Sequence, residues 1–288
     1  MTTATHSTDP ATASVAPART TAKARPPKVD LSLKILHEVF GLEHLHYGLW
    51  DGEPLTLDGL KAAQQRYQDY LHSWIPGDVR RVLDVGAGVG TGALALKRRG
   101  CHVEGLSPDP YQRERFIALT GLPFHLARFQ EHRLTAAFDL VLMSESAQYI
   151  PVAALFARAR PLVPRGHLLV ADYFRRPNLT RHLNKSGHQL DAFLAAAAAS
   201  GFELVRREDV TSRVTPTLDF ARLWVERHAD PALRIGYEAL ARRHRIVFWL
   251  ARALIERLLA KLQSQRHVLD GAEFARTKSY ELMLFRVR

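Results

Sequence analysis

Four glycines in seven residues follow a short apolar run at 82–85, and the chain after them continues as a helix. Glycine adopts positive φ without strain and lets a ligand approach the backbone, because it carries no Cβ. A strand, a glycine turn and a helix in this order place a bound metabolite over a helix N-terminus. The residues that we predict to hold such a ligand are Asp84, Gly86, Gly88 and Gly90.

Two other interpretations of the turn compete with this one. Residues 88–93 also match the dinucleotide-binding pattern G-x-G-x-x-A. Against it, Asp84 would bring a negative charge close to a pyrophosphate. A glycine turn without any ligand is the other alternative, but glycines at a strand–helix junction are costly unless something must approach closely.

Strands and helices alternate along the rest of the chain. Apolar runs predict strands at 81–85, 103–106, 123–127, 138–143, 167–172, 202–205 and 279–285. Helical spacing and turn signals predict helices at 31–45, 56–75, 90–99, 110–119, 151–160 (ending before Pro161) and 188–199. This order predicts an α/β fold with a doubly wound, mostly parallel sheet of seven strands.

The stretch Asp84-Val85-Gly86-Ala87-Gly88-Val89-Gly90 resembles the first motif of the class I S-adenosylmethionine-dependent methyltransferases. The element order from about 78 to 288 also resembles their Rossmann-like fold, which ends in an antiparallel strand beside the sixth strand. The resemblance implies S-adenosyl-L-methionine as cofactor, with the glycine turn around its amino-acid end and Asp84 close by.

Three local stretches narrow this resemblance to the small-molecule and lipid methyltransferases related to cyclopropane-fatty-acid synthases and tocopherol methyltransferases. They are His46-Tyr47-Gly48-Leu49-Trp50, Leu106-Ser107-Pro108 with Tyr111-Gln112, and Ser144-Glu145-Ser146-Ala147-Gln148-Tyr149-Ile150. The resemblance divides the chain into a helical lid at 31–77, a core at 78–213, a helical insert that caps the substrate at 214–270 and the last strand at 271–288. Residues 1–30 lack apolar periodicity and are expected to be a disordered tail, with an organelle targeting segment as the alternative.

The sequence departs from the family at the end of the second strand, where most members place an acidic residue that binds the ribose. Ser107 stands there, followed by Asp109. We expect both residues near the ribose, although Asp109 before Pro110 is equally typical of a helix N-cap. After the third strand, Phe129 and Gln130 are expected at the adenine, with an ordinary solvated turn as the alternative.

Catalytic candidates lie where the carboxyl ends of the strands meet, because a parallel sheet binds ligands there. Glu145 and Tyr149 follow the fourth strand, and His46 lies in the lid. Each could act as a base that deprotonates the acceptor, or could have only a capping or hydrogen-bonding role. The expected apolar substrate pocket consists of Tyr47, Trp50, Tyr173, Phe248 and Trp249, and no spacing of histidines indicates a metal site.

Composition limits the remaining classes. The single cysteine among 288 residues excludes a disulfide framework and a cysteine-based zinc site, and suits a reducing cytoplasm. The chain has no run of 18 apolar residues, so the sequence predicts no membrane span. Residues 206–288 hold 17 basic and 10 acidic residues, a large share of the net charge of +11. The basic, amphipathic stretch at 246–262 is typical of contact with an anionic membrane or of a solvated helix face.

These observations predict a methyltransferase that acts on a hydrophobic or lipid-like small molecule. A nucleic-acid methyltransferase is an alternative suggested by charge alone. It is disfavoured because Ser144-Glu145-Ser146-Ala147, and no Asn-Pro-Pro-Tyr-like loop, follows the fourth strand. The alternative from another class is a non-catalytic membrane-surface protein that keeps a vestigial cofactor fold.

Overall fold

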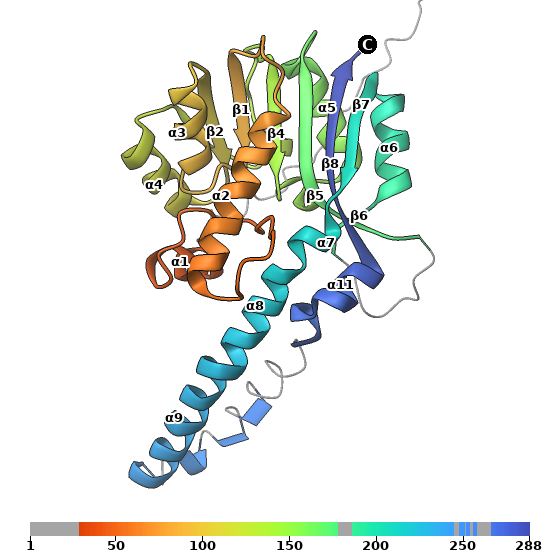
Figure 1. The fold of residues 1–288 in the computed structure, drawn as a ribbon. Coiled ribbons are helices and arrows are strands. Elements are labelled where there is room, and N and C mark those ends of the chain that lie inside the picture. Colours follow the sequence, from red (N-terminus) through yellow and green to blue (C-terminus); the bar gives the residue numbers. More distant parts are fainter. Residues whose placement is uncertain (1–28, 178–185, 245–247, 251, 254–255, 258–265) are drawn as a thin grey trace, which may run out of the picture.

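A mixed sheet forms the centre of the computed structural model, which describes residues 29–177, 186–244, 248–250, 252–253, 256–257 and 266–288 (Figure 1). Its strand order is β3-β2-β1-β4-β5-β8-β7, and β6 pairs with β5. The strands are β1 Arg81–Val85, β2 His102–Ser107, β3 Phe124–Leu126, β4 Leu140–Ser144, β5 His167–Arg175, β6 His188–Gln189, β7 Phe202–Asp209 and β8 Lys278–Val287.

Strands β1 to β6 pair in parallel, and β8 runs antiparallel between β5 and β7. The predicted doubly wound fold, with its antiparallel last strand, is therefore confirmed. The structure adds the two-residue strand β6 and extends β7 by four residues beyond the prediction.

Helices cover both faces of the sheet because successive strand residues point to opposite sides. Leu83 and Val85 pack with the helices α5 and α6, whereas Val82 packs with α2 and α3 on the other face. The bounds of these helices and of α4 are α2 Leu57–Ser73, α3 Thr91–Arg98, α4 Pro110–Thr120, α5 Val152–Leu162 and α6 Leu190–Ala199.

Helix α5 differs from its prediction because it passes through Pro161 instead of ending before it. Proline in the last turn removes one backbone donor, which costs less there than in a helix interior. Burial of Leu162 and Val163 in the core offsets that loss.

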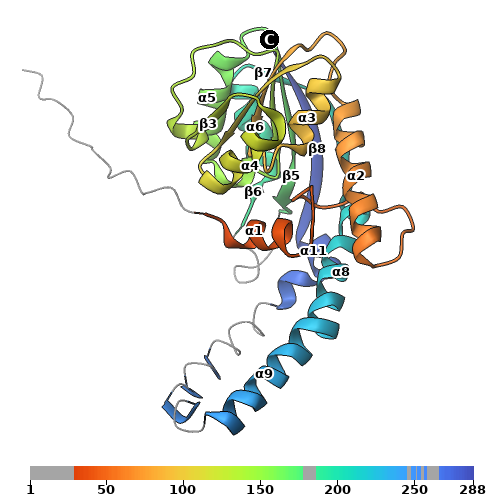
Figure 2. The ribbon, with the colours of Figure 1, turned by 90° about the vertical axis from the view of Figure 1, so that its left-hand side faces the viewer.

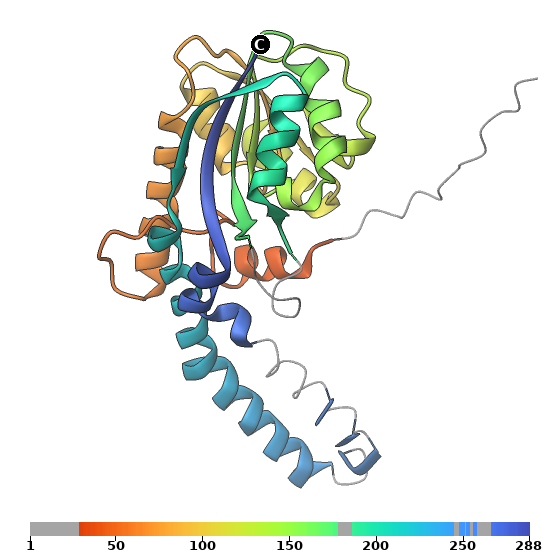
Figure 3. The same ribbon diagram turned by 90° about the vertical axis from the view of Figure 1, so that its right-hand side faces the viewer.

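The lid consists of α1 Leu31–Glu38, a loop and α2. Helix α1 lies below the lower edge of the sheet, where the parallel strands end (Figure 3), and none of its residues is buried. It is shorter than the predicted helix at 31–45. The chain turns at Gly41, where φ is +62°, and then continues as a loop up to Thr56.

An arm of continuous helix leaves the lower end of the sheet and projects away from it (Figures 1 and 2). It comprises α7 Thr211–Val214, α8 Pro216–Trp224, the π-helical turn η3 Val225–Ala229 and α9 Asp230–Arg243. The chain returns through η4 Arg266–Leu269 and α11 Gly271–Thr277 to β8. Much of the predicted amphipathic stretch at 246–262, and nearly all of the predicted tail at 1–30, lies outside the described residues.

Candidate active site

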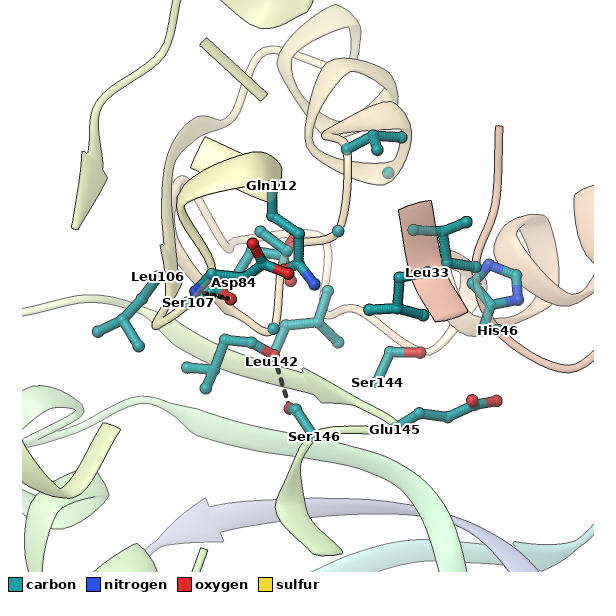
Figure 4. Close-up of a pocket in the computed structure, with 18 of the residues that line it drawn as sticks. Leu33, His46, Asp84, Leu106, Ser107, Gln112, Leu142, Ser144, Glu145 and Ser146 are labelled. Carbon is teal, nitrogen blue, oxygen red and sulfur yellow. Dashed lines mark hydrogen bonds between the residues drawn. The ribbon is translucent and has the colours of Figure 1, made fainter. Parts of the chain in front are cut away.

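A cavity of about 530 Å³ lies at the carboxyl ends of β1, β2 and β4. Helix α1 contributes Leu33 to its wall, and the lid loop contributes His46. Figure 4 shows these two side chains on the same side as Ser144 and Glu145, with Asp84, Ser107 and Gln112 on the other side. The predicted convergence of lid, glycine turn and strand ends is therefore what the fold produces.

The glycine turn is held in the left-handed region, with φ of +79° at Gly86, +56° at Gly88 and +99° at Gly90. Glycine is required at these three positions for different reasons. A Cβ at Gly86 would lie 2.6 Å from the Cβ of Ser146, and one at Gly90 would lie 3.0 Å from the ring of Phe116. Gly88 lines the cavity, and a Cβ there would meet no atom within 4 Å. Gly88 is thus the glycine that we predict to keep space for a ligand.

Asp84 lies in the cavity wall and is almost completely buried. Among the described residues, no hydrogen bond to its carboxyl is found. Burial raises the pKa of Asp84 to about 7. A cationic or donor group of a ligand would favour the ionised carboxylate here.

Both polar residues expected at the ribose line the cavity, and both also have structural roles. Asp109 caps α4 through the backbone N–H of Tyr111, at 2.8 Å, and its other oxygen accepts from the N–H of Asp30, at 3.0 Å. Ser107 accepts a hydrogen bond from the N–H of Asp109. The N-cap alternative therefore holds for Asp109, which at the same time joins the core to the lid.

Gln112 is a site residue that the sequence analysis did not select. It is 7 % exposed, its Oε1 has no partner among the described residues, and it extends into the cavity beside Asp84 (Figure 4). A buried, unpaired amide oxygen in a cavity fits a ligand that carries hydroxyl groups. Its position on the first turn after Leu-Ser-Pro is the sequence signal that could have indicated it.

Phe129 and Gln130 lie on the 3₁₀ turn η1 Phe129–Glu131 and line the cavity. The ring of Phe129 is buried in the core cluster, whereas Gln130 is half-buried. Their contact with adenine stays a prediction.

Glu145 directly follows β4 and is the one described non-glycine residue with positive φ, at +54°. Such conformations are costly and are found at functional sites. Its Oε1 accepts from the backbone N–H of Tyr47, at 2.7 Å, and from the hydroxyl of Tyr280, at 2.9 Å. Burial nevertheless raises the pKa of Glu145 to about 8. Glu145 is thus able to exchange a proton near neutral pH.

The other two catalytic candidates also line the cavity. The Nδ1–H of His46 donates to the carbonyl of Tyr47, at 2.7 Å, and burial lowers the pKa of His46 to about 3. His46 is therefore neutral and a weak base. Tyr149 is 77 % exposed at the rim, and desolvation together with the nearby Tyr173 and Asp172 raises the pKa of its phenol to about 12. Its neutral phenol can donate a hydrogen bond.

The loop after β4, which carries Glu145 and Tyr149, is fixed by Asp172, which is 1 % exposed. Its two oxygens accept the backbone N–H groups of Gln148, at 2.9 Å, and of Tyr173, at 2.8 Å. Asp172 therefore holds the 3₁₀ turn η2 Ala147–Tyr149 in place.

Three residues predicted for the substrate pocket do not line the cavity. The ring of Tyr47 packs against Phe274, and Lys278 Nζ lies 3.9 Å above the ring of Tyr173. Trp50 is buried in the lid core. Burial against the arm and β8, rather than exposure to a ligand, satisfies these aromatic rings.

The predicted cap formed by Phe248 and Trp249 is wrong. Trp249 is 77 % exposed, and Phe248 packs against Tyr237 of α9 with ring centroids 5.0 Å apart. Neither lines the cavity. The reason is that α8, η3 and α9 continue as one helix away from the sheet (Figure 2) instead of folding over its edge.

Residues 60–215 match a family model described as a methyltransferase domain. The chain belongs to the class I S-adenosylmethionine-dependent methyltransferases. Methyltransferase GfsG of Streptomyces halstedii is 29 % identical over 213 residues, which are 65 % of this chain and 76 % of that protein. The 27-O-demethylrifamycin SV methyltransferase of Amycolatopsis mediterranei (strain S699) is 29 % identical over 214 residues, with the same two shares.

The fold is also that of a solved geranyl diphosphate C-methyltransferase from Streptomyces coelicolor A3(2), in complex with S-adenosyl-L-homocysteine. The TM-score is 0.61 at 16 % identity, over 88 % of this chain and 93 % of that one. Membership of the class I S-adenosylmethionine-dependent methyltransferases gives S-adenosyl-L-methionine as the cofactor. The cavity fits it, because Gly88 leaves open space and because Asp84 and Gln112 offer unpaired oxygens to a cation and to hydroxyl groups. In the described residues, no cluster of three or more His, Cys, Asp or Glu side chains could hold a metal ion.

We predict that Gly88→Ala weakens cofactor binding at least about tenfold, because its methyl group occupies space that the cofactor needs. Gly121→Ala is the matched control, since Gly121 has a similar φ of +64°, is equally open and lies outside the cavity. Both variants should lose a similar, small amount of stability. Isothermal titration calorimetry that finds equal affinities for the two variants would refute the role of Gly88.

We also predict that cofactor affinity depends on the ionisation of Asp84. Protonation of Asp84 below about pH 7 removes the charge that attracts a cationic cofactor. The affinity should therefore fall as pH decreases from 8 to 6, by up to about tenfold per pH unit. Asp84→Asn should bind weakly and without this slope. An unchanged slope in titrations of Asp84→Asn would assign the pH dependence to another group.

Proposed function

We propose that this methyltransferase transfers the methyl group to a hydroxyl oxygen of a hydrophobic small molecule, with Glu145 as general base. The observation that supports it best is the place of Glu145. Its carboxyl lies at the cavity end nearest the lid, on a strained backbone, with a pKa of about 8.

The reaction needs alignment and removal of a proton. When bound, S-adenosyl-L-methionine supplies an electrophilic methyl group on its sulfonium. The chain must hold the acceptor oxygen in line with that group. Glu145 would take the hydroxyl proton as the oxygen bonds to the methyl carbon, so the carboxylate becomes a carboxylic acid. The carbon–sulfur bond would break in the same step and leave its electron pair on the sulfur.

The hydrophobic acceptor is supported by the cavity wall and by a relative. Leu33 and Ile150 are apolar wall residues, and Tyr149 offers both a ring and a hydroxyl at the rim. A relative that is 29 % identical is named 27-O-demethylrifamycin SV methyltransferase, and this name supports an oxygen atom as the methyl acceptor. Because the arm does not cap the cavity, a lipid-like acceptor has no advantage over other hydrophobic molecules.

A nucleic-acid acceptor is disfavoured by the charges of the cavity. Asp84, Asp109 and Glu145 all contribute to its wall. Above about pH 8, where Asp84 and Glu145 are ionised, these carboxylates repel a polyanionic backbone.

We propose as well that the tip of the arm contacts an anionic membrane surface. We define this tip as residues 234–244, 248–250, 252–253 and 256–257. Ile235, Trp249 and Leu250 are 62 %, 77 % and 71 % exposed there. Arginines neighbour them, and this combination of aromatic, aliphatic and cationic side chains suits the lipid headgroup region. In the described residues, no helix has both the length and the apolar character that crossing a membrane requires. The location that we propose is cytoplasmic.

The base assignment predicts a specific variant phenotype. Glu145→Gln should reduce kcat at least about a hundredfold, since general-base catalysis contributes that much or more. Wild-type kcat should rise with pH up to about 8, because protonated Glu145 cannot accept a proton. Transfer of a labelled methyl group to a panel of hydroxylated hydrophobic compounds, with products identified by mass, measures both. A Glu145→Gln variant with wild-type kcat would exclude Glu145 as the base.

The membrane proposal predicts that the protein sediments with vesicles of phosphatidylglycerol and not with vesicles of phosphatidylcholine. The double variant Trp249→Ser, Leu250→Ser should lose most of this binding and keep its methyltransferase activity. Val268→Ser is a matched control, because Val268 is 58 % exposed outside the tip. Concentration-dependent dimers without vesicle binding would instead identify the tip as a contact between two copies.

A further inference from the structure

A chain of hydrogen bonds joins two residues of the cavity wall through two tyrosines that the proposed function leaves unused. The hydroxyl of Tyr67 lies 3.0 Å from Ser144 Oγ and 2.8 Å from the hydroxyl of Tyr280. Tyr280 in turn lies 2.9 Å from Glu145 Oε1. Both tyrosines are completely buried, and Tyr67 stands on α2 while Tyr280 stands on β8.

The direction of these hydrogen bonds follows from the number of protons available. An ionised carboxylate only accepts, so Tyr280 must donate its single hydroxyl proton to Glu145. Tyr280 is then free to accept the proton of Tyr67, and Tyr67 accepts that of Ser144. The lone pairs of Ser144 are consequently left for the cavity, whose wall includes this residue.

We infer that Tyr280, supported by Tyr67, is a positioning residue of the methyl transfer: the pair holds the Glu145 carboxyl in place and turns the Ser144 hydroxyl so that it accepts from a second donor group of the acceptor molecule, not from the hydroxyl whose proton Glu145 takes. This inference rests on the proposed role of Glu145 as base. The two tyrosines would not touch the substrate. They act through Glu145 and Ser144.

The surroundings of Glu145 explain why it needs such support. The titratable groups that face it are Asp172, Tyr47, Tyr67, Tyr149, Tyr173 and Tyr280. Burial raises the pKa of each of these tyrosines, so they stay neutral near pH 8, and Asp172 adds a like charge. Only hydrogen-bond donors counteract burial and this charge. The donors found in the described residues are the Tyr280 hydroxyl and the backbone N–H of Tyr47.

The test is the pH dependence of kcat in Tyr280→Phe, which keeps the buried ring and removes the donor. Loss of the donor should move the acidic limb of the profile up by about one pH unit, so kcat falls about tenfold at pH 7 and recovers towards pH 9. Tyr67→Phe should shift the limb less and raise KM for the acceptor, because Ser144 loses its fixed orientation.

Tyr70→Phe is the matched control for both variants. Tyr70 lies on the same helix as Tyr67 and also donates to a carboxylate, Glu208, but on the protein surface. Its removal should leave the pH profile unchanged. An infrared pH titration of the protonated carboxyl band, assigned by subtracting Glu145→Gln, measures the same shift without turnover. Circular dichroism verifies that the variants fold.

The variants distinguish the base role of Glu145 from the positioning role of Tyr280. If Glu145→Gln retains wild-type kcat, the proposed base is wrong. If Glu145→Gln is inactive while Tyr280→Phe keeps the wild-type limb and carboxyl band, only the positioning role is wrong. A loss of kcat that is equal at pH 7 and pH 9 would show that Tyr280 serves the core alone.

Discussion

The pairing of β8 between β5 and β7 is the constraint on which the site depends. The register of β5 with β8 sets Tyr173 opposite Tyr280 and Asp172 opposite Glu281. Glu281 is completely buried and forms two hydrogen bonds with Arg207 of β7, which fixes the strand from its other side. Loss of Arg207 would leave the buried Glu281 carboxylate without this partner, so the pair favours this register. Only this register brings Tyr280 to the loop that follows β4.

Three carboxyl groups lie near the edge of the sheet where the parallel strands end, and burial makes their ionisation costly. The pKa values of Asp84 and Asp172 are raised to about 7, and that of Glu145 to about 8. An acidic group whose pKa is raised in the folded state makes the folded protein less stable as the pH rises through that pKa. Two backbone donors offset the loss at Asp172. Asp84 has no such donor in the described residues, so a bound cation is what can offset its loss.

Helix α1 of the lid provides access to this edge at a low energetic cost. Helix α1 buries none of its residues and is joined to the core by polar contacts at its margins. Examples are the Asp30 N–H to Asp109, at 3.0 Å, and His37 to Tyr111, at 2.7 Å. Segments with little buried apolar area open at a small fraction of the global unfolding free energy. We therefore expect α1, rather than the buried helix α2 or the sheet, to move when ligands enter.

The sequence by itself determined the sheet, the glycine turn with Asp84 and the place of Glu145, because these follow from local patterns and from the rule that parallel strands end at one edge. Tertiary structure alone decided what Gln112, Tyr67 and Tyr280 do, since the two tyrosines are 213 positions apart. It also decided the course of the arm. An amphipathic pattern shows that a helix has an apolar face, but it does not show which surface that face meets. The direction of a helix is fixed by packing at its base, which no local pattern in the sequence records.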